Sequence, residues 1–241
     1  GKRYEAEPKL NMKKVFAVII AIVVIIMFIF IIKGLLTKDD TDGKITSESY
    51  FAVYKDNKWG VINSSGNYVI DPSYAEMIVV PNNKAGVFIV TYDIDYENET
   101  YKTKVLNEKN EEIFIGYDKI ETISNQDKNG NLLYEENVLK VQKDEKFGLI
   151  NLSGKEILKT EYEEIVSIST IENSFKIKKD GKYGIADSEG KVIVDTKYLD
   201  IDVLGKDNKS GFIVKEDSGK CGIIDYSNNQ ILEAKYDTIE K

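Results

Sequence analysis

The sequence predicts an all-β domain of about five tandem β-meander repeats, after one N-terminal transmembrane α-helix. Three observations predict this fold class: an uncharged apolar run near the start, a set of residue types that recurs at fixed offsets, and apolar–polar alternation within each copy. We expect a basic tail at 1–14, a transmembrane helix at 15–36, a linker at 37–49 and the repeat domain at 50–241. The repeats are expected to form either a propeller-like ring or an open twisted array.

The transmembrane helix is predicted from 18 consecutive apolar residues, Val15 to Ile32, without a charge, Gly, Pro or hydroxyl. At about 1.5 Å per residue this run spans the hydrocarbon core of a bilayer. A buried core helix of this length is expected to carry a polar stripe. A cleaved signal peptide is the stronger alternative, but no small-x-small cleavage site follows the run. We therefore expect an uncleaved signal anchor.

The flanking charges predict the orientation of this helix. Lys9, Lys13 and Lys14 precede it, and basic residues are retained on the cytoplasmic side. The chain from Asp39 onward carries a net charge of −13. We therefore expect a single-pass protein of the cell membrane, with a cytoplasmic N-terminus and an extracytoplasmic repeat domain.

The first residues carry a separate hint. The stretch Gly1-Lys2-Arg3-Tyr4 resembles the end of a short zinc ribbon, in which the last Cys is often followed by Gly and a basic residue. This resemblance implies a cytoplasmic zinc-binding head before Gly1. A disordered basic tail is the alternative.

The repeat is defined by columns, counted from an aromatic residue that precedes a glycine. Asn or Asp stands four residues after this ring column, Gly or Asn seven after it, an apolar pair ten and eleven after it, and Tyr fifteen after it. The ring columns of repeats 1 to 5 are Trp59, Thr103, Phe147, Tyr183 and Cys221. Repeat 2 departs most, because Thr103-Lys104 replaces the aromatic–Gly pair and its Tyr117 comes one residue early.

Each column predicts a local structure. The alternating stretches on both sides of the ring column predict a hairpin. The Gly after the ring predicts either a bulge or close approach by a neighbouring ring. The side chain of Asn or Asp at +4 can bond to the main chain, and Gly or Asn at +7 tolerates positive φ, so a second turn is expected there. The Tyr and the Ile after it are expected to begin a short fourth strand, so that one unit is a meander of three or four strands.

The run Lys58-Trp59-Gly60-Val61-Ile62-Asn63-x-x-Gly66, followed by Tyr74, resembles the WG repeat, also called the KWG repeat, of bacterial proteins. The resemblance covers about residues 50–241. It implies tandem β units on secreted or membrane-attached proteins and supplies no catalytic residues.

Composition argues against several function classes. The chain has no histidine, which removes Ser-His-Asp and Cys-His catalysis and most zinc sites. The strong negative charge argues against nucleic-acid binding. We expect no enzyme activity and no cofactor.

Candidate binding residues lie where repeat 2 departs from the pattern. Its first hairpin is lengthened, and Tyr92, Tyr96 and Tyr101 lie in or near the extension, free of any repeat column. Asp93, Asp95 and Glu97 in the same hairpin are calcium candidates, although the spacing of a helix-loop-helix calcium site is missing.

We expect a non-catalytic binding or scaffolding domain displayed outside a bacterial membrane, with a cell-wall polymer or another protein as its partner. The alternatives are a sensing ectodomain coupled to the cytoplasmic zinc ribbon and a cell-wall hydrolase.

Overall fold

The computed structural model describes residues 48–205 and 210–241. The chain divides into two units, 1–46 and 47–241, and every described residue belongs to the second. The predicted basic tail, transmembrane helix and most of the linker lie outside the described residues. Within those residues, no helix is long and apolar enough to cross a membrane.

The described residues form antiparallel β-sheets, which confirms the all-β repeat architecture. The sheets, with their strands in bonded order, are β1 (Tyr50–Lys55), β2 (Lys58–Asn63) and β3 (Tyr68–Tyr74); β4 (Val87–Asp95), β5 (Thr100–Asn107) and β6 (Glu112–Ile113); β7 (Lys119–Glu121), β10 (Val138–Lys143), β11 (Lys146–Asn151) and β12 (Glu156–Tyr162); β13 (Glu164–Ile168), β14 (Ile171–Lys179), β15 (Lys182–Asp187) and β16 (Val192–Tyr198); β17 (Asp200–Val203), β18 (Phe212–Lys215), β19 (Cys221–Ile224) and β20 (Gln230–Tyr236); and the hairpin β8 (Ser124–Gln126) and β9 (Leu132–Tyr134).

The fourth strand that follows a repeat pairs with the next sheet, so a unit has three strands of its own rather than four. β13 follows Tyr162 of repeat 3 but pairs with β14 of repeat 4, and β7 and β17 likewise pair forward with β10 and β18. After repeat 1 this strand is reduced to a single bridge between Val79 and Ile89. Repeats 2, 3 and 4 therefore each contribute three strands to their own sheet and one to the next, which joins adjacent sheets through the main chain.

The ring column and the Tyr at +15 are partners across a strand pair. Trp59 lies opposite Tyr74, Phe147 opposite Tyr162, and Tyr183 opposite Tyr198. In repeat 5 the pair is Cys221 and Tyr236, and the Cys221 thiol is free and buried. The two columns thus hold together the second and third strands of their sheet.

The glycine after the ring is required by a close approach of backbone. A Cβ at Gly148 would lie 2.6 Å from the carbonyl oxygen of Leu158 and 2.9 Å from the backbone N of Thr160. The ladder shifts register at this point, because the third strand bulges toward the glycine. Of the two roles expected for this glycine, the bulge is confirmed.

The turn columns are confirmed in all five repeats. In repeat 3, Asn151 Oδ1 accepts hydrogen bonds from the backbone N–H groups of Ser153 and Lys155 at 3.0 and 2.9 Å. The residues at +7 have positive φ throughout, between 59° and 88°. Asp127 and Gly130 build the same turn in the β8–β9 hairpin, with Asp127 Oδ1 2.8 Å from the N of Asn131.

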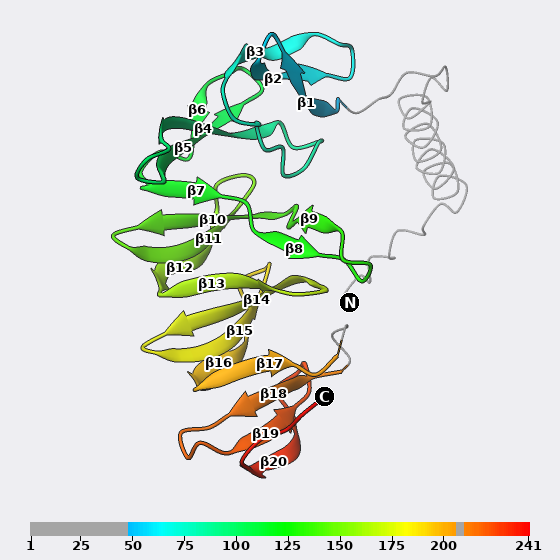
Figure 1. The fold of residues 1–241 in the computed structure, drawn as a ribbon, viewed down its shortest axis with the longest axis vertical. Coiled ribbons are helices and arrows are strands. Elements are labelled where there is room, and N and C mark those ends of the chain that lie inside the picture. The colour runs from blue at the N-terminus through cyan, green and yellow to red at the C-terminus, as the bar shows by residue number, and fades with distance from the viewer. Residues whose placement is uncertain (1–47, 206–209) are drawn as a thin grey trace, which may run out of the picture. The chain divides into compact units, whose positions relative to one another are not determined.

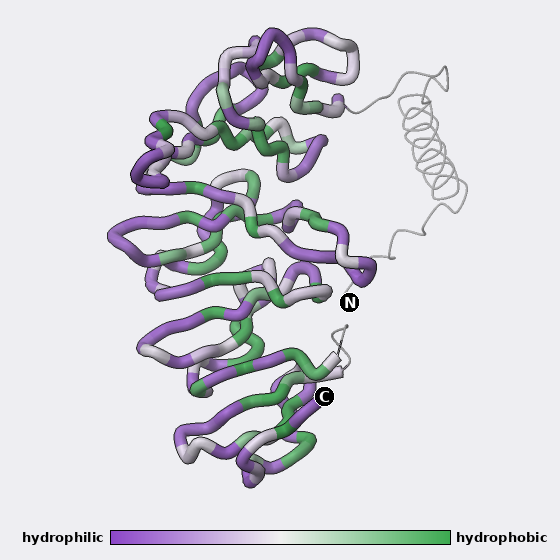
Figure 2. The backbone as a smooth tube through the Cα atoms, viewed as in Figure 1, coloured by the Kyte–Doolittle hydropathy of each residue, from purple (hydrophilic) through white to green (hydrophobic). Residues whose placement is uncertain are grey.

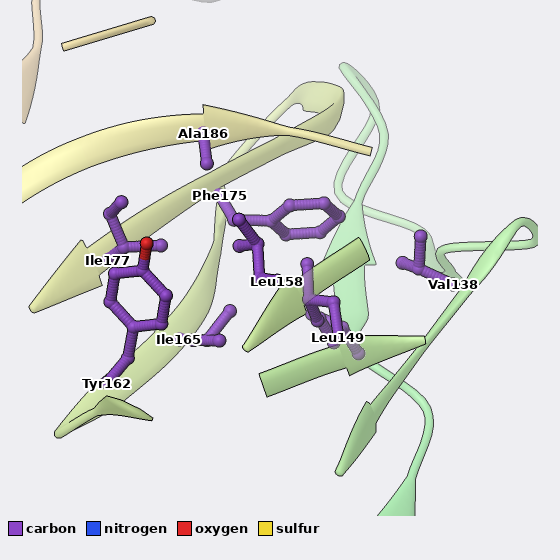
Figure 3. Close-up of a cluster of buried hydrophobic side chains, with 9 residues drawn as sticks. Val138, Leu149, Leu158, Tyr162, Ile165, Phe175, Ile177 and Ala186 are labelled. Atoms are coloured by element: carbon purple, nitrogen blue, oxygen red, sulfur yellow. The ribbon is translucent and has the colours of Figure 1, made fainter. Parts of the chain in front are cut away.

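The hydrophobic core lies between consecutive sheets. The cluster between repeats 3 and 4 contains Leu149 and Leu158 from one sheet and Phe175 and Ile177 from the next, and Figure 3 shows Phe175 projecting among the side chains of the preceding sheet. Three further clusters occupy the other sheet-to-sheet contacts of the described unit. Figure 2 shows hydrophobic residues along the strands and hydrophilic residues at the turns. Each repeat therefore depends on its neighbour for burial.

The sheets of this unit follow one another in chain order. Figure 1 shows β1–β3 at one end of the row and β17–β20 at the other. Contacts between elements likewise join neighbours, such as β3 with β4, β5 with β7 and β15 with β17. Within the described residues, the ring alternative therefore finds no support.

Candidate functional site

A cleft of about 910 Å³ lies beside the lengthened hairpin of repeat 2. Five parts of the chain line it: 76–79, β4–β5, the stretch 121–124 that begins in β7, Lys140 of β10, and β13. These segments belong to three consecutive sheets, which follow one another in Figure 1. We call this hollow the hairpin cleft.

One wall of the hairpin cleft is the lengthened β4–β5 hairpin of repeat 2. β4 has nine residues and β5 has eight, whereas the equivalent strands of repeats 1 and 3 have six each. The extension brings Tyr96 and Tyr101 to the cleft, together with Thr100. The lining of the cleft is thus built partly from residues that have no counterpart in the other repeats.

Two carboxylates fix the tyrosines of the extension from opposite sides. The hydroxyl of Tyr96 donates to Glu76 Oε1 at 2.8 Å, and the hydroxyl of Tyr101 donates to Glu121 Oε1 at 2.8 Å. Glu76 follows β3 and Glu121 ends β7, so the hairpin tip is held between repeat 1 and the sheet of repeat 3. Tyr96 remains 72% exposed and Tyr101 41% exposed. Both rings are therefore positioned and still accessible.

Glu121 is the most constrained charge of the site. Lys119 Nζ lies 2.8 Å from its Oε1, and Lys140 Nζ lies 3.9 Å from its Oε2. Burial raises the pKa of Glu121, but hydrogen bonds from Lys119 and Tyr101 and the charges of both lysines outweigh it, so this pKa lies below its usual value. The Lys119 ammonium also lies 3.8 Å from the centroid of the Tyr101 ring. Glu121 therefore remains ionised at neutral pH.

The rest of the cleft combines an apolar base with hydroxyl groups. Ile89, Ile123 and Ile165 are at most 5% exposed and line its inner side. Six hydroxyl side chains besides the tyrosines line it: Thr91, Thr100, Thr103, Thr122, Ser124 and Ser167. Such a surface offers rings and aliphatic groups for packing and many groups for hydrogen bonding.

The structure brings together two of the three predicted tyrosines. Tyr96 and Tyr101 line the hairpin cleft, whereas Tyr92 is not among its lining residues. The ring of Tyr92 instead has Lys104 Nζ 5.2 Å from its centroid. Sequence reasoning missed Glu76 and Glu121, because no spacing within a repeat relates them to the tyrosines.

Two of the three calcium candidates, Asp93 and Asp95, have other partners in the structure. Asp93 pairs with Lys102 Nζ at 2.5 Å. Asp95 caps its turn, with Oδ1 accepting from the N of Glu97 at 3.0 Å and Oδ2 accepting from Asn98 Nδ2 at 2.7 Å. Among residues 48–205 and 210–241, no group of three or more His, Cys, Asp or Glu side chains is placed to hold a metal ion.

A smaller hollow of about 180 Å³ lies beside the first strands of the sheets of repeats 4 and 5. Ser167 lines both hollows. The smaller one is lined further by Lys176, Ile201 and Asp202. The two hollows therefore follow the same strand position, the first strand of successive sheets.

Comparison with known proteins agrees with this architecture. A family model described as "WG containing repeat" matches residues 59–89 and 147–183. The chain carries WG repeats. Both matches begin at a ring column and continue past the fourth strand into the next sheet, so one WG repeat spans the main-chain junction between sheets. No curated protein matches the chain.

Proposed function

We propose that the WG-repeat unit is a non-catalytic binding domain, and that the hairpin cleft is its binding site. The observation that carries the proposal is the clamp on the hairpin tip, in which Glu76 and Glu121 orient Tyr96 and Tyr101 beside an apolar base. Preformed concave sites with a few oriented polar groups are typical of ligand binding. The partner is a cell-wall polymer or a protein outside a bacterial membrane.

The electrostatics of Glu121 favour binding over hydrolysis. Glycoside hydrolysis needs a carboxylic acid whose pKa is raised, so that it can protonate the leaving group. The pKa of Glu121 is lowered by Lys119, Tyr101 and Lys140. A carboxylate held in this way orients its neighbours and accepts hydrogen bonds from a ligand.

The proposal includes the membrane anchor predicted from residues 15–36, with the N-terminus in the cytoplasm. Its support is the uncharged run from Val15 to Ile32 and the lysines that precede it. In this arrangement the WG repeats face the wall. A zinc-ribbon head before Gly1 would make the same cleft the outer part of a sensor.

Co-sedimentation of the full chain, in mild detergent, with purified bacterial cell walls tests the proposal. Tyr96→Ala removes an exposed ring of the cleft, and Tyr92→Ala removes a ring of the same hairpin outside the cleft lining. We expect the wild type and Tyr92→Ala to sediment with the walls and Tyr96→Ala to remain in solution. Equal sedimentation of the two variants would show that the cleft is not the binding site.

A protein partner is tested in parallel. Crosslinking from a photoreactive residue at position 96 and at position 92 compares the two sides of the hairpin on intact cells. A protein captured from position 96 only would assign the cleft to a protein. If neither walls nor a protein engages position 96, the proposal is wrong.

A further inference from the structure

We propose that the hairpin cleft binds a linear glycan that carries free amino groups, along the first strands of successive sheets. This inference rests on the proposed function and names the ligand class of that site. It follows from four properties of the cleft: its length, its charge, its exposed rings and the state of the neighbouring strand edges.

The size of the cleft indicates a chain of several sugar units. Its volume of about 910 Å³ is near the upper end of the roughly 300–1,000 Å³ that sites for single small ligands occupy. The smaller hollow adjoins it at Ser167, which lines both. A ligand that fills the whole path therefore lies across β7 and β13 and reaches β17, which an extended polymer can do.

The charge of the lining indicates a cationic ligand. Four carboxylates line the hairpin cleft, from Glu76, Asp95, Glu99 and Glu121, against the ammonium of Lys140. That ammonium lies 3.9 Å from Glu121 and is partly neutralised by it. Lys119 Nζ also lies 2.8 Å from Glu121, so the remaining negative charge comes from Glu76, Asp95 and Glu99. A polyanion is repelled from this lining, whereas ammonium groups along a ligand are attracted to it.

The exposed rings and hydroxyls favour sugar units. Tyr96 is 72% exposed and its hydroxyl is already directed by Glu76, so its ring is available for the apolar face of a pyranose. Thr100, Thr122 and Ser124 supply hydroxyls on both sides of the cleft. An amino sugar matches this combination, with C–H faces for the ring, hydroxyls for the Thr and Ser side chains and an ammonium for the carboxylates.

The strand edges argue against an extended basic peptide. A peptide that adds to a sheet edge needs unpaired backbone groups there. Beside the cleft, the N–H of Ile120 already donates to Oγ1 of the lining residue Thr103 at 3.0 Å. The carbonyl oxygen of Ser124 already accepts from Ser167 Oγ at 2.7 Å. Two backbone groups that a peptide strand would use are thus bonded to side chains.

The test is calorimetric titration of the full chain in mild detergent with glucosamine oligomers of two to eight units. N-acetylglucosamine oligomers, oligogalacturonate and an oligolysine peptide are titrated in the same way. We expect glucosamine oligomers to bind most tightly, with an affinity that rises with length to a plateau. We expect binding to weaken as salt is raised, because the attraction is between exposed charges.

Two variants separate the contribution of the Tyr96 ring to glycan binding from that of the Glu76 charge. Tyr96→Ala should weaken glucosamine oligomers about tenfold, the loss typical of one well-placed contact residue, and Tyr92→Ala should change little. Glu76→Gln keeps an acceptor for the Tyr96 hydroxyl and removes one charge. It should weaken glucosamine oligomers and leave N-acetylglucosamine oligomers unaffected, so that the two glycans approach each other in affinity.

The outcomes separate this inference from the proposed function. If oligolysine, oligogalacturonate or only the acetylated glycan binds and depends on Tyr96, the amino-sugar assignment is wrong while the cleft remains a binding site. The other outcome is that none of the probes binds, that binding to cell walls does not depend on Tyr96, and that no protein crosslinks from position 96. In that case both the amino-sugar assignment and the proposed function are wrong.

Discussion

Replacing Gly60 with Ala should destabilise repeat 1 far more than any change at Gly66, although both glycines lie in the same repeat. A Cβ at Gly60 would lie 2.5 Å from the carbonyl oxygen of Ile70 and 2.8 Å from the backbone N of Pro72. Both contacts are with backbone, so no side-chain rotation relieves them. The substituted protein has to move β3 away from β2.

The size of the effect follows from that movement. Ordinary contact begins at 3.4 Å, so the carbonyl of Ile70 has to retreat by about 0.9 Å. Inserting a methyl group into a closely packed site typically costs about 1–3 kcal/mol, and a weakened ladder hydrogen bond adds about 1 kcal/mol. Val61 and Ile70 are at most 2% exposed, so their packing is disturbed as well. We expect a loss of about 3 kcal/mol.

Gly66 supplies the matched control. Its φ is +80° and no atom lies within 4 Å of the position that a Cβ would take, so only the backbone conformation opposes substitution. Ala at this φ costs about 1–2 kcal/mol. Asn should cost less, because Asn110 and Asn228 occupy the same column with φ of 59° and 66°. The expected order of destabilisation is Gly60→Ala, then Gly66→Ala, then Gly66→Asn.

Trp59, the only tryptophan, reports on this repeat directly. Urea unfolding of the full chain, followed by Trp59 fluorescence and by circular dichroism, gives the midpoints. With a slope of about 2 kcal/mol/M, the Gly60→Ala midpoint should fall by about 1.5 M. A Gly60→Ala midpoint equal to that of Gly66→Asn would refute the reasoning, because the backbone contact would then carry no cost.

Three further substitutions test the core, the buried polar network and the turn. Tyr162→Ala should lower the free energy of unfolding by about 3 kcal/mol in urea, because this side chain is 7% exposed in a core cluster. Tyr236→Ala, at 41% exposed, should lower it by less than about 1 kcal/mol. Equal losses would contradict the burial of Tyr162 between stacked sheets. Glu135→Ala should lower the free energy of unfolding by about 1–3 kcal/mol and make the β8–β9 hairpin more sensitive to protease. This carboxylate is 2% exposed and accepts hydrogen bonds from Asn125 Nδ2 and from the backbone N–H of Asn173 in β14. Glu136→Ala, at an exposed position, is the control, and an equal effect of the two substitutions would contradict the role of this hydrogen-bond network. The pKa of Asp225 is lowered by hydrogen bonds from the amide side chain and backbone N–H at the far end of its turn, so its contribution to stability is present above the unfolded pKa of about 3.9 and lost as pH falls through the folded pKa. Asp225→Asn should therefore lose less stability than the wild type between about pH 5 and pH 2, measured by urea midpoints, and a steeper loss would contradict this sign.

The local rules of the fold could be predicted from the sequence because each is enforced within a few residues. The Asn or Asp at +4 bonds to its own turn, as Asp187 does with the N–H groups of Glu189 and Lys191 at 3.0 and 2.9 Å. The glycine at +7 has positive φ for the same turn, as Gly190 does at 88°. Such interactions require no knowledge of the neighbouring repeats.

The partner of the fourth strand could not be predicted in the same way. Glu164–Ile168 follows β12 directly, so its sequence position favours neither its own sheet nor the next. Its pairing with β14, in which Ile165 lies opposite Ile177, depends on the side of the strand on which the next repeat packs. This choice is made by packing between repeats, which a single repeat does not encode.

The candidate site could be predicted in part, because residues outside the repeat columns are free of the repeat's structural role. This criterion indicates Tyr96 and Tyr101, and both line the hairpin cleft. The same criterion indicates Tyr92, which does not line it, because the criterion says nothing of the side on which a side chain emerges. Glu76 and Glu121 lie 20 residues from their tyrosines and belong to neighbouring sheets, so only the stacked structure brings them together.

The hairpin cleft lies at the repeat that departs most from the repeat pattern, and this has a physical reason. In the other repeats, glycine after the ring column admits a bulge, and the third strand continues until its Tyr faces the ring. Repeat 2 has Lys104 at that position, and its third strand β6 ends at Ile113 without forming the Tyr pair. Thr103 replaces the ring, and its hydroxyl turns to the N–H of Ile120, beside the cleft that it lines. An array of identical repeats presents the same surface on every repeat. A distinct binding site therefore requires one repeat that departs from the common pattern. The loss of ring and glycine in repeat 2, together with its longer hairpin, provides that departure.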